Sequence, residues 1–283
     1  MIRRIIRIVR RKLFFNKCSF DTKKEYILSK DYNKLYGKVA VVTGGSGHIG
    51  RAIVSKLAVE GAIVYVCGTN INNIQAVVDE VLSLGGVAHS CVINVMDSLE
   101  IERAFNNIIA KEEKIDILVN CAGGGSRSEA KEIAEQEVSV IDNILNSNLR
   151  GSILCVRAVA SKMKLQKWGR IIDIGSAVAT GGLPKYSEYA AAKAGCIAFV
   201  RSVAMELGRY GVTVNCVSPG IVQRGEITEE IFQNIRKTNW LDSYGTAEDI
   251  SEMVAYLCSE KARFITGQNL LVDGGRTLGL KNN

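Results

Sequence analysis

The stretch VAVVTGGSGHIG, residues 39–50, leads directly into RAIVSKLAVEG, residues 51–61. The first four residues form an apolar run of strand type, the next eight a glycine-rich turn, and the last eleven carry apolar residues at helical spacing. Glycines permit a tight turn and a close approach of the backbone to a pyrophosphate, and the helix N-terminus offers free N–H groups and partial positive charge. A glycine turn placed between strand and helix predicts a dinucleotide site, with an ordinary turn as the alternative.

Six further apolar runs follow, separated by segments long enough to form helices. They are IVYVC (63–67), a run ahead of Asn94, DILVN (116–120), RIIDIG (170–175), VTVNCVS (212–218) and NLLVDG (269–274). Strands buried on both faces of a parallel sheet have such continuous apolar sequences, and the segments between them can cross over as helices. The pattern predicts one α/β domain of the Rossmann type, a doubly wound parallel sheet of about seven strands with helices on both faces. The strand order stays open.

The charge of the chain is concentrated at its start. Residues 1–36 hold eleven Lys and Arg against three Asp and Glu, a net charge of +8, whereas the remaining residues hold 25 basic and 26 acidic side chains, a net charge of −1. We therefore divide the 283-residue chain into a basic N-terminal extension, 1–36, and a catalytic domain, 37–283. Because the domain itself is neutral, nothing indicates a nucleic-acid partner.

The extension has the pattern of a basic amphipathic helix. Apolar residues recur at three- and four-residue intervals from Ile2 to Leu13, with arginines and a lysine between them. Three interpretations stay open: peripheral membrane contact through residues 1–20, organelle targeting by residues 1–36, and a plain solvated extension. No run in the rest of the chain is typical of a bilayer span, so we expect a soluble, cytoplasmic body.

Metal and histidine chemistry are disfavoured. The eight cysteines form no CxxC pair, and several lie in apolar runs, which favours buried, reduced thiols. His48 and His89 are the two histidines of the chain, and neither has ligand spacing to other metal-binding residues. We expect no metal site.

The end of the second predicted strand, Cys67-Gly68-Thr69-Asn70, bears on cofactor choice. It lacks the Asp or Glu that hydrogen-bonds the adenosine ribose in NAD sites, and such an acid would repel a 2′-phosphate. Its hydroxyl and amide groups, together with Arg51 just after the turn, favour NADP(H) over NAD(H).

Several motifs occur together downstream. They are Asn120-Cys121-Ala122-Gly123, Asn148 in NLRG, Ser176, Tyr189 and Lys193 in YAAAK, Pro219-Gly220, and FITGQNLLVDGG at 264–275. With the glycine turn, they make residues 36–280 resemble the short-chain dehydrogenase/reductase family. Within it, the sequence is most similar to 3-oxoacyl-[acyl-carrier-protein] reductases and related ketone or sugar-alcohol reductases.

The resemblance implies a role for each of four residues. Tyr189 would be the general acid in reduction and the general base in oxidation, and Lys193 would acidify it and hydrogen-bond the nicotinamide ribose. Ser176 would polarise the substrate oxygen, and Asn148 would hold a water that links Lys193 to solvent. Tyr186 lacks a lysine four residues on and is not assigned. The residues assigned to the dinucleotide are Thr43, Gly44, Gly45, Ser46, Gly47, His48, Ile49, Gly50, Thr69, Asn70, Asn94, Val95, Asn120, Ala122, Gly123, Tyr189, Lys193, Pro219, Gly220 and Val222.

Three positions depart from the family pattern. His48 replaces a glycine, although Gly44, Gly47 and Gly50 keep the TGxxGxxG spacing of the family's extended branch. Asn94 replaces an aspartate, so that its amide carbonyl would serve the adenine amino group. Arg224 stands where a threonine commonly contacts the nicotinamide carboxamide, and we expect it to meet solvent or an anionic substrate.

The predicted function is reduction of a ketone, such as a 3-oxoacyl or related carbonyl substrate, to a secondary alcohol by an NAD(P)H-dependent oxidoreductase. Residues 221–245 are expected to form a substrate lid, with Trp240 and Tyr244 lining a pocket or packing on the body. The resemblance also implies a homodimer or homotetramer formed through helices at about 134–163 and 186–208. The alternatives are a nucleotide-binding sensor or scaffold without turnover and a sugar-modifying epimerase or dehydratase.

Overall fold

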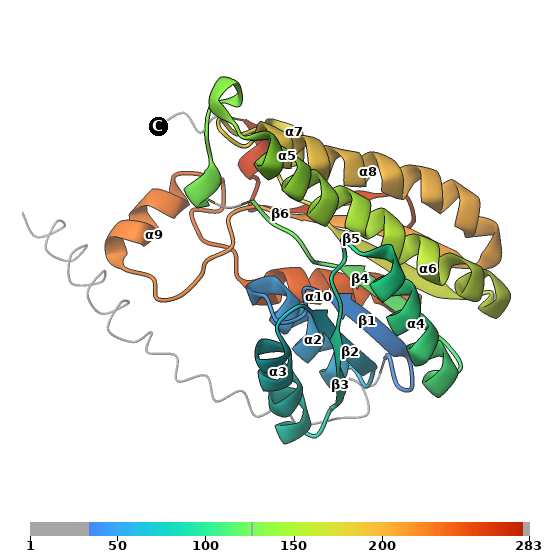
Figure 1. Ribbon diagram of the computed structural model, residues 1–283. Helices are drawn as coiled ribbons and strands as arrows, with labels where there is room; N and C mark the ends of the chain where they lie inside the picture. The colour runs from blue at the N-terminus through green and yellow to red at the C-terminus, as the bar shows by residue number, and fades with distance from the viewer. Residues whose placement is uncertain (1–33, 126, 280–283) are drawn as a thin grey trace, which may run out of the picture.

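A computed structural model describes residues 34–125 and 127–279 of the chain. Its seven strands form a single parallel sheet in the order β3-β2-β1-β4-β5-β6-β7 (Figure 1). The strands are β1 Val39–Thr43, β2 Ile63–Gly68, β3 Val87–Val92, β4 Ile117–Asn120, β5 Gly169–Ile174, β6 Val212–Pro219 and β7 Asn269–Val272. The predicted seven-stranded α/β fold is confirmed, and the strand order, which the sequence left open, is that of a doubly wound sheet.

Helices connect the successive strands and cover both faces of the sheet (Figure 1). The α-helices are α2 His48–Val59, α3 Ile71–Ser83, α4 Ser98–Glu112, α5 Val138–Leu145, α6 Gly151–Gln166, α7 Val178–Gly181, α8 Ser187–Leu207, α9 Glu229–Arg236 and α10 Ala247–Cys258. The short elements are η1 Arg127–Glu129, η2 Ile133–Glu135, the π-helical turn η3 Asn146–Arg150, η4 Gly208–Tyr210, η5 Glu260–Ala262 and η6 Arg276–Leu278.

Alternate residues of each strand pack against opposite layers of helices. Ala40 and Val42 lie in a cluster with apolar residues of α2, α3 and α10, whereas Val39 and Val41 lie in another with residues of α4, α6 and α8. All four are fully buried, because side chains alternate across a strand and helices cover both faces. This double burial explains the continuous apolar sequences of the inner strands, whereas the outer strand β3 leaves Val87 and Val92 exposed.

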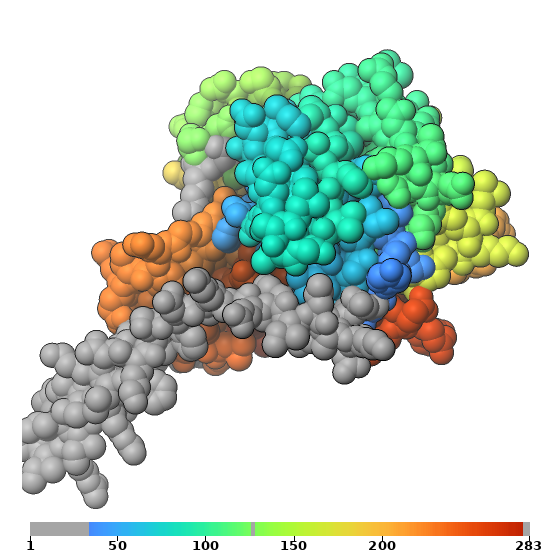
Figure 2. Space-filling model, turned by 90° about the horizontal axis from the view of Figure 1, so that it is seen from below, coloured from blue at the N-terminus to red at the C-terminus, as the bar shows by residue number. Residues whose placement is uncertain are grey.

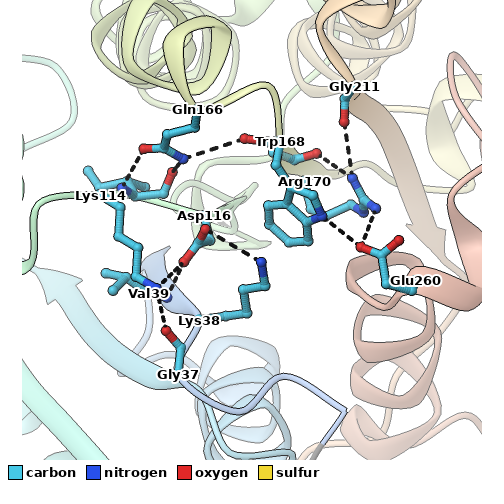
Figure 3. Close-up of polar contacts among 12 residues, drawn as sticks. Gly37, Lys38, Val39, Lys114, Asp116, Gln166, Trp168, Arg170, Gly211 and Glu260 are labelled. Atoms are coloured by element: carbon cyan, nitrogen blue, oxygen red, sulfur yellow. Dashed lines mark hydrogen bonds and ion pairs between the residues drawn. The ribbon is translucent and has the colours of Figure 1, made fainter.

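Many polar contacts of the sheet lie where its strands begin and end. A network of hydrogen bonds and ion pairs closes the edge formed by the amino ends of the strands (Figure 3). The buried Asp116 carboxylate accepts the Val39 N–H at 2.9 Å and pairs with Lys114 and Lys38 at 3.4 and 3.8 Å. This carboxylate ties the start of β1 to the residue that precedes β4.

The same network continues to β5 and the segment after α10. Arg170, only 2% exposed, donates to the Glu260 carboxylate at 3.1 Å, and the Trp168 indole N–H donates to the same oxygen at 2.6 Å. Lys38 Nζ lies 3.5 Å and Arg170 Cζ 4.3 Å from the centroid of the Trp168 ring. Buried charges need such partners, and here they fasten the amino edge of the sheet.

The helix expected over about 134–163 is interrupted in the structure. Residues 133–135 form a short 3₁₀ turn, α5 begins at Val138, and the π-helical turn η3 separates α5 from α6. Within the turn, the Ser147 hydroxyl donates to the Asn143 carbonyl at 2.7 Å. Such π-helical turns are frequent at functional sites, and this one contains Asn148.

Residues 221–245, the predicted lid, contain α9 and extend away from the sheet (Figure 1). The backbone of the segment pairs with itself at Val222 and Gly245, and the Trp240 N–H donates to the Gly274 carbonyl after β7 at 2.9 Å. The Tyr244 ring packs edge-on against Phe232 of α9 with their centroids 6.1 Å apart. The two ends of the segment are thus joined to each other, and the contact with Gly274 anchors the segment to the body of the domain.

The predicted amphipathic helix of the extension lies outside the described residues. Leu35, near the end of the extension, is 2% exposed and packs in the cluster that contains α2. None of the helices in the described part of the chain has the length and apolar character of a membrane span. The seven cysteines among the described residues are unpaired, and five of them are buried.

Candidate active site

The glycine turn joins the carboxyl end of β1 to the start of α2. Gly47 is the N-cap residue of α2, and no side chain caps the helix. A Cβ atom on Gly50 would lie 2.1 Å from the Gly44 carbonyl oxygen, so glycine alone fits this close approach. The free N–H groups at the start of α2 are therefore available to an anion.

Thr43 connects the turn to the neighbouring strand end. Its buried hydroxyl oxygen accepts the backbone N–H groups of Cys121 and Ala122 at 3.1 and 3.2 Å. β1 and β4 are the strands between which the order of the sheet reverses. In open α/β sheets ligands bind in the crevice at this point, outside the carboxyl ends of the strands.

Most of the residues assigned to the dinucleotide follow strands at this carboxyl edge. They comprise the turn 43–50, Thr69 and Asn70 after β2, Asn94 and Val95 after β3, Asn120, Ala122 and Gly123 at β4, and Pro219, Gly220 and Val222 at β6. The fold thus brings together segments that are up to 179 residues apart in the chain, from Thr43 to Val222.

Two of these side chains already make hydrogen bonds within the protein. The Asn120 amide donates to Asp173 of β5 at 2.7 Å and to the Ser152 carbonyl of α6 at 3.4 Å, so that it points toward these two elements. The Asn94 carbonyl, which we expected to serve adenine, accepts the Met96 N–H at 3.0 Å and retains one lone pair for a further donor.

The end of β2 carries no carboxylate. Thr69 and Asn70 are exposed, and the Asn70 side chain caps α3 by accepting the Asn73 N–H at 3.1 Å. The nearby cation, Arg51, donates from Nε to the Glu80 carboxylate of α3 at 2.6 Å. A 2′-phosphate would have to share Arg51 with this carboxylate.

Asn148 is held rigidly in η3. Its amide nitrogen donates to the carbonyls of Ile144 and Gly124 at 3.0 and 3.2 Å, while its Oδ1 atom is buried and has no hydrogen-bond partner among the described residues. A Cβ atom on Gly123, whose φ is +106°, would lie 2.5 Å from Oδ1. The unpartnered oxygen fits the predicted role of Asn148 in holding a water.

Lys193 is buried on α8, one helical turn beyond Tyr189. Its ammonium donates to the Ile174 carbonyl at the end of β5 at 2.8 Å and lies 5.8 Å from the centroid of the Tyr189 ring. One backbone contact fixes the position of the charge, and an ammonium has two more N–H donors to offer.

Ser176 and Tyr189 are both half-buried and come from neighbouring elements. Ser176 follows β5, and its hydroxyl oxygen accepts the Val178 N–H at 3.2 Å, which leaves the O–H free to donate. The loop after β4 covers the tyrosine, since a Cβ atom on Gly125 would lie 3.3 Å from the Tyr189 ring. The Gln136 amide of the same loop donates to Glu188 at 3.0 Å.

Asp173 is a residue of this region that the sequence analysis did not single out. It is 1% exposed, and burial raises the pKa of its carboxyl to about 6, although hydrogen bonds from Asn120 and Ser152 and the charge of Lys193 oppose this rise. An aspartate inside the apolar run RIIDIG was the available signal. Burial likewise raises the pKa of the Cys121 thiol to about 11.

Among the described residues, no group of three or more His, Cys, Asp or Glu side chains is arranged to hold a metal. The uncapped helix N-terminus, the glycine turn and the crevice between β1 and β4 fit a dinucleotide. The arrangement offers a hydroxyl, a phenol, a buried ammonium and an unpartnered amide oxygen on one side of that crevice.

Comparisons with known proteins agree with this geometry. A family model described as enoyl-(acyl carrier protein) reductase matches residues 44–277. The chain is 37% identical over 246 residues to the 3-oxoacyl-[acyl-carrier-protein] reductase FabG of Aquifex aeolicus, covering 86% of this chain and 98% of the relative. It is 37% identical over 242 residues to FabG of Escherichia coli, covering 84% and 97%.

Solved structures share the fold. A putative gluconate dehydrogenase from Agrobacterium tumefaciens superposes with a TM-score of 0.83 at 27% identity, covering 88% of this chain and 99% of the other. A short-chain type dehydrogenase/reductase from Mycobacterium ulcerans superposes with a TM-score of 0.82 at 25% identity, covering 88% and 93%.

The buried carboxyl of Asp173 generates a prediction on stability. Because its pKa is raised on folding from 3.8 to about 6, the carboxylate form destabilises the folded protein. This penalty is absent below about pH 4, grows as the pH rises to about 6 and is then constant. Asp173→Asn, which keeps the acceptor for Asn120, should gain stability relative to the unaltered protein over this range, reaching about 3 kcal/mol at neutral pH.

Urea unfolding at several pH values measures the difference between the two proteins. Asp97→Asn is the control, since it replaces the exposed N-cap carboxylate of α4 by an equally good capping amide. If Asp173→Asn is instead less stable at pH 8, the carboxylate is stabilised by its surroundings and the prediction is wrong.

Proposed function

Because the chain belongs to the short-chain dehydrogenase/reductase family, we propose that it is a nicotinamide-dinucleotide-dependent oxidoreductase that reduces a ketone to a secondary alcohol. The proposed substrate class is a 3-oxoacyl thioester on an acyl carrier protein or a related carbonyl compound. Its products are the corresponding 3-hydroxyacyl compound and the oxidised dinucleotide.

The observation that carries this proposal is the likeness to 3-oxoacyl-[acyl-carrier-protein] reductases over nearly their whole length, 97–98%. The gathering of Asn148, Ser176, Tyr189 and Lys193 beside the crevice supports it, because these are the groups that proton transfer to a carbonyl oxygen requires. A dinucleotide-binding scaffold without turnover would need none of them.

Each side chain has a distinct part in the proposed reaction. The free Ser176 O–H donates to the substrate carbonyl oxygen and polarises it, and the Tyr189 phenol transfers its proton to that oxygen as the alcohol forms. The buried Lys193 ammonium stabilises the resulting tyrosinate. The bound dinucleotide supplies the hydride that adds to the carbonyl carbon.

Asn148 and Lys193 together support the return of the proton. Both are held by backbone carbonyls, of Ile144 and Gly124 for Asn148 and of Ile174 for Lys193. The unpartnered Asn148 Oδ1 can accept from a water, and a water held there can pass protons toward Lys193 and the tyrosinate. In this proposal Asn148 positions the water through which Tyr189 is reprotonated.

We further propose that NADPH is the preferred dinucleotide. The end of β2 has no carboxylate to repel a 2′-phosphate or to hydrogen-bond the ribose hydroxyls of NADH. The exposed Thr69 and Asn70 supply a hydroxyl and an amide there, and Arg51 of α2, which pairs with Glu80, supplies a cation.

Substrate choice is proposed to reside in the segment 221–245 and in the loop 123–137. Arg224 is exposed at the entry of this lid, and Trp240 is 47% exposed at its exit. An anionic carrier or thioester would meet Arg224 before it reaches Tyr189.

Assembly into a homodimer or homotetramer through α5, α6 and α8 stays a prediction, supported by the exposed apolar side chains of Val138, Leu165 and Met205 on these helices.

The function predicts opposite effects for two neighbouring tyrosines. Tyr189→Phe removes the transferable proton and should lower kcat at least about 100-fold while NADPH binding is kept. Tyr186→Phe, the matched control on the adjacent half-buried tyrosine, should keep most of the turnover. The measurement is NADPH oxidation with a 3-oxoacyl thioester, alongside a fluorescence titration of NADPH.

Equal turnover of the two variants would refute the role of Tyr189. NADPH binding by the unaltered protein without turnover of any 3-oxoacyl thioester or other carbonyl compound would instead support a sensor.

Cofactor preference predicts the effect of Asn70→Asp. Aspartate caps a helix as well as asparagine, so α3 should keep its stability while a carboxylate now faces the adenosine ribose. NADPH should bind at least about tenfold more weakly and NADH more tightly, as a charge at this position sets the choice between them. Titrations of both dinucleotides test this, and an unchanged ratio of the two dissociation constants would contradict it.

For the extension we propose contact of residues 1–20 with an anionic membrane surface, motivated by the basic amphipathic pattern, with organelle targeting as the alternative. The full chain should co-sediment with vesicles of anionic phospholipid and much less with neutral ones. A chain lacking residues 1–20 should remain in the supernatant, and undiminished co-sedimentation of that chain would rule the contact out.

A further inference from the structure

His48 connects the glycine turn to the lid. Its Nε2 atom lies 2.7 Å from the backbone carbonyl oxygen of Gln223. A carbonyl oxygen can only accept, so the imidazole must carry its proton on Nε2 and donate it.

The bond spans the crevice between distant strands. His48 follows β1 and Gln223 follows β6, and β4 and β5 lie between these two strands in the sheet. The contact therefore joins the chain that leaves β6 to the glycine turn that follows β1. Figure 2 shows the orange lid segment lying against the blue start of α2.

Gln223 is the residue at which the lid is organised. Its side-chain amide donates to the carbonyls of Arg224, Gly225 and Glu226 at 3.0 to 3.3 Å, which closes the entry of the lid into a compact turn. Its backbone N–H donates to the Gly245 carbonyl at the lid exit at 2.9 Å. A side chain that holds Gln223 therefore holds both ends of the segment.

We infer that His48 is a latch: its bond to Gln223 fastens the lid across the crevice and must open before a bound dinucleotide can leave. The inference rests on the proposed function in that the crevice receives a dinucleotide. His48 acts through the position of the lid and takes no part in proton transfer to the substrate, so it is a positioning residue.

The first test needs no cofactor. Hydrogen exchange of the peptides that cover 221–228 is compared in the free full-length protein and in His48→Ala, His48→Gln and His89→Ala. Loss of one neutral hydrogen bond should accelerate exchange of this segment roughly three- to tenfold in His48→Ala. His48→Gln keeps an amide donor and should stay near the unaltered protein.

His89→Ala is the matched control for removal of a histidine. His89 lies on β3, away from the lid. The centroids of its ring and the Tyr65 ring are 5.0 Å apart, and its Nε2 atom lies 3.3 Å from Lys111 Nζ. Its loss should leave the exchange of 221–228 unchanged. Peptides from α8 serve as the internal reference in every variant.

The second test is the rate at which NADPH dissociates, measured by stopped-flow fluorescence after displacement. The rate should rise roughly three- to tenfold in His48→Ala and much less in His48→Gln, with thermal stability unchanged because His48 is exposed. A lid that exchanges at the same rate with and without the imidazole overturns the latch, whatever happens to turnover.

The two proposals fail in different ways. If the unaltered protein binds no NADPH, the proposed function fails, while the exchange experiment still reports on the bond between His48 and Gln223. If NADPH binds and is oxidised normally but His48→Ala neither loosens 221–228 nor speeds dissociation, the latch alone is wrong.

Discussion

Burial of the sheet on both faces is the constraint from which the rest of the structure follows. With α2, α3 and α10 packed on one face and α4, α6 and α8 on the other, polar groups can be satisfied only at the two edges where strands begin and end. The two edges are used differently. At the amino edge, the charged side chains of Asp116, Arg170 and Glu260 are paired with one another or with neighbouring cations. At the carboxyl edge, the start of α2 has no side-chain cap and the Asn148 oxygen has no hydrogen-bond partner within the described part of the chain.

Buried hydrogen bonds hold the polar side chains at the carboxyl edge in place. Lys193 and Asn148 are each fixed by backbone carbonyls, and Thr43 joins the ends of β1 and β4 through its hydroxyl. Asp173 beneath them carries a raised pKa, so burial there costs free energy. We interpret this cost in free energy as the consequence of burying several polar side chains side by side, where hydrogen bonds between them fix their positions.

The lid segment, residues 221–245, is less buried and is held by fewer contacts. Its aromatic residues are partly exposed. A backbone hydrogen bond between Gln223 and Gly245 joins its two ends, and backbone hydrogen bonds to Gly274 hold it to the body. Segments of this kind open at low cost, whereas η3 and α8 lie against the core. In the proposed reaction the dinucleotide enters and leaves in each cycle, and a segment that is fastened at a few points fits this requirement.

Much of this protein could be predicted from the sequence, because local chemistry decided it. Apolar runs of strand length, the glycine turn before α2 and the spacing of Tyr189 and Lys193 depend on short-range periodicity and on residue type, and they predicted the seven-stranded fold and the candidate site. The strand order, the π-helical turn around Asn148, the engagement of Asn120 by Asp173 and the bond between His48 and Gln223 could not be predicted. The two contacts join separate elements, 53 positions apart for Asn120 and Asp173 and 175 for His48 and Gln223, and no local pattern records which distant group a side chain will meet.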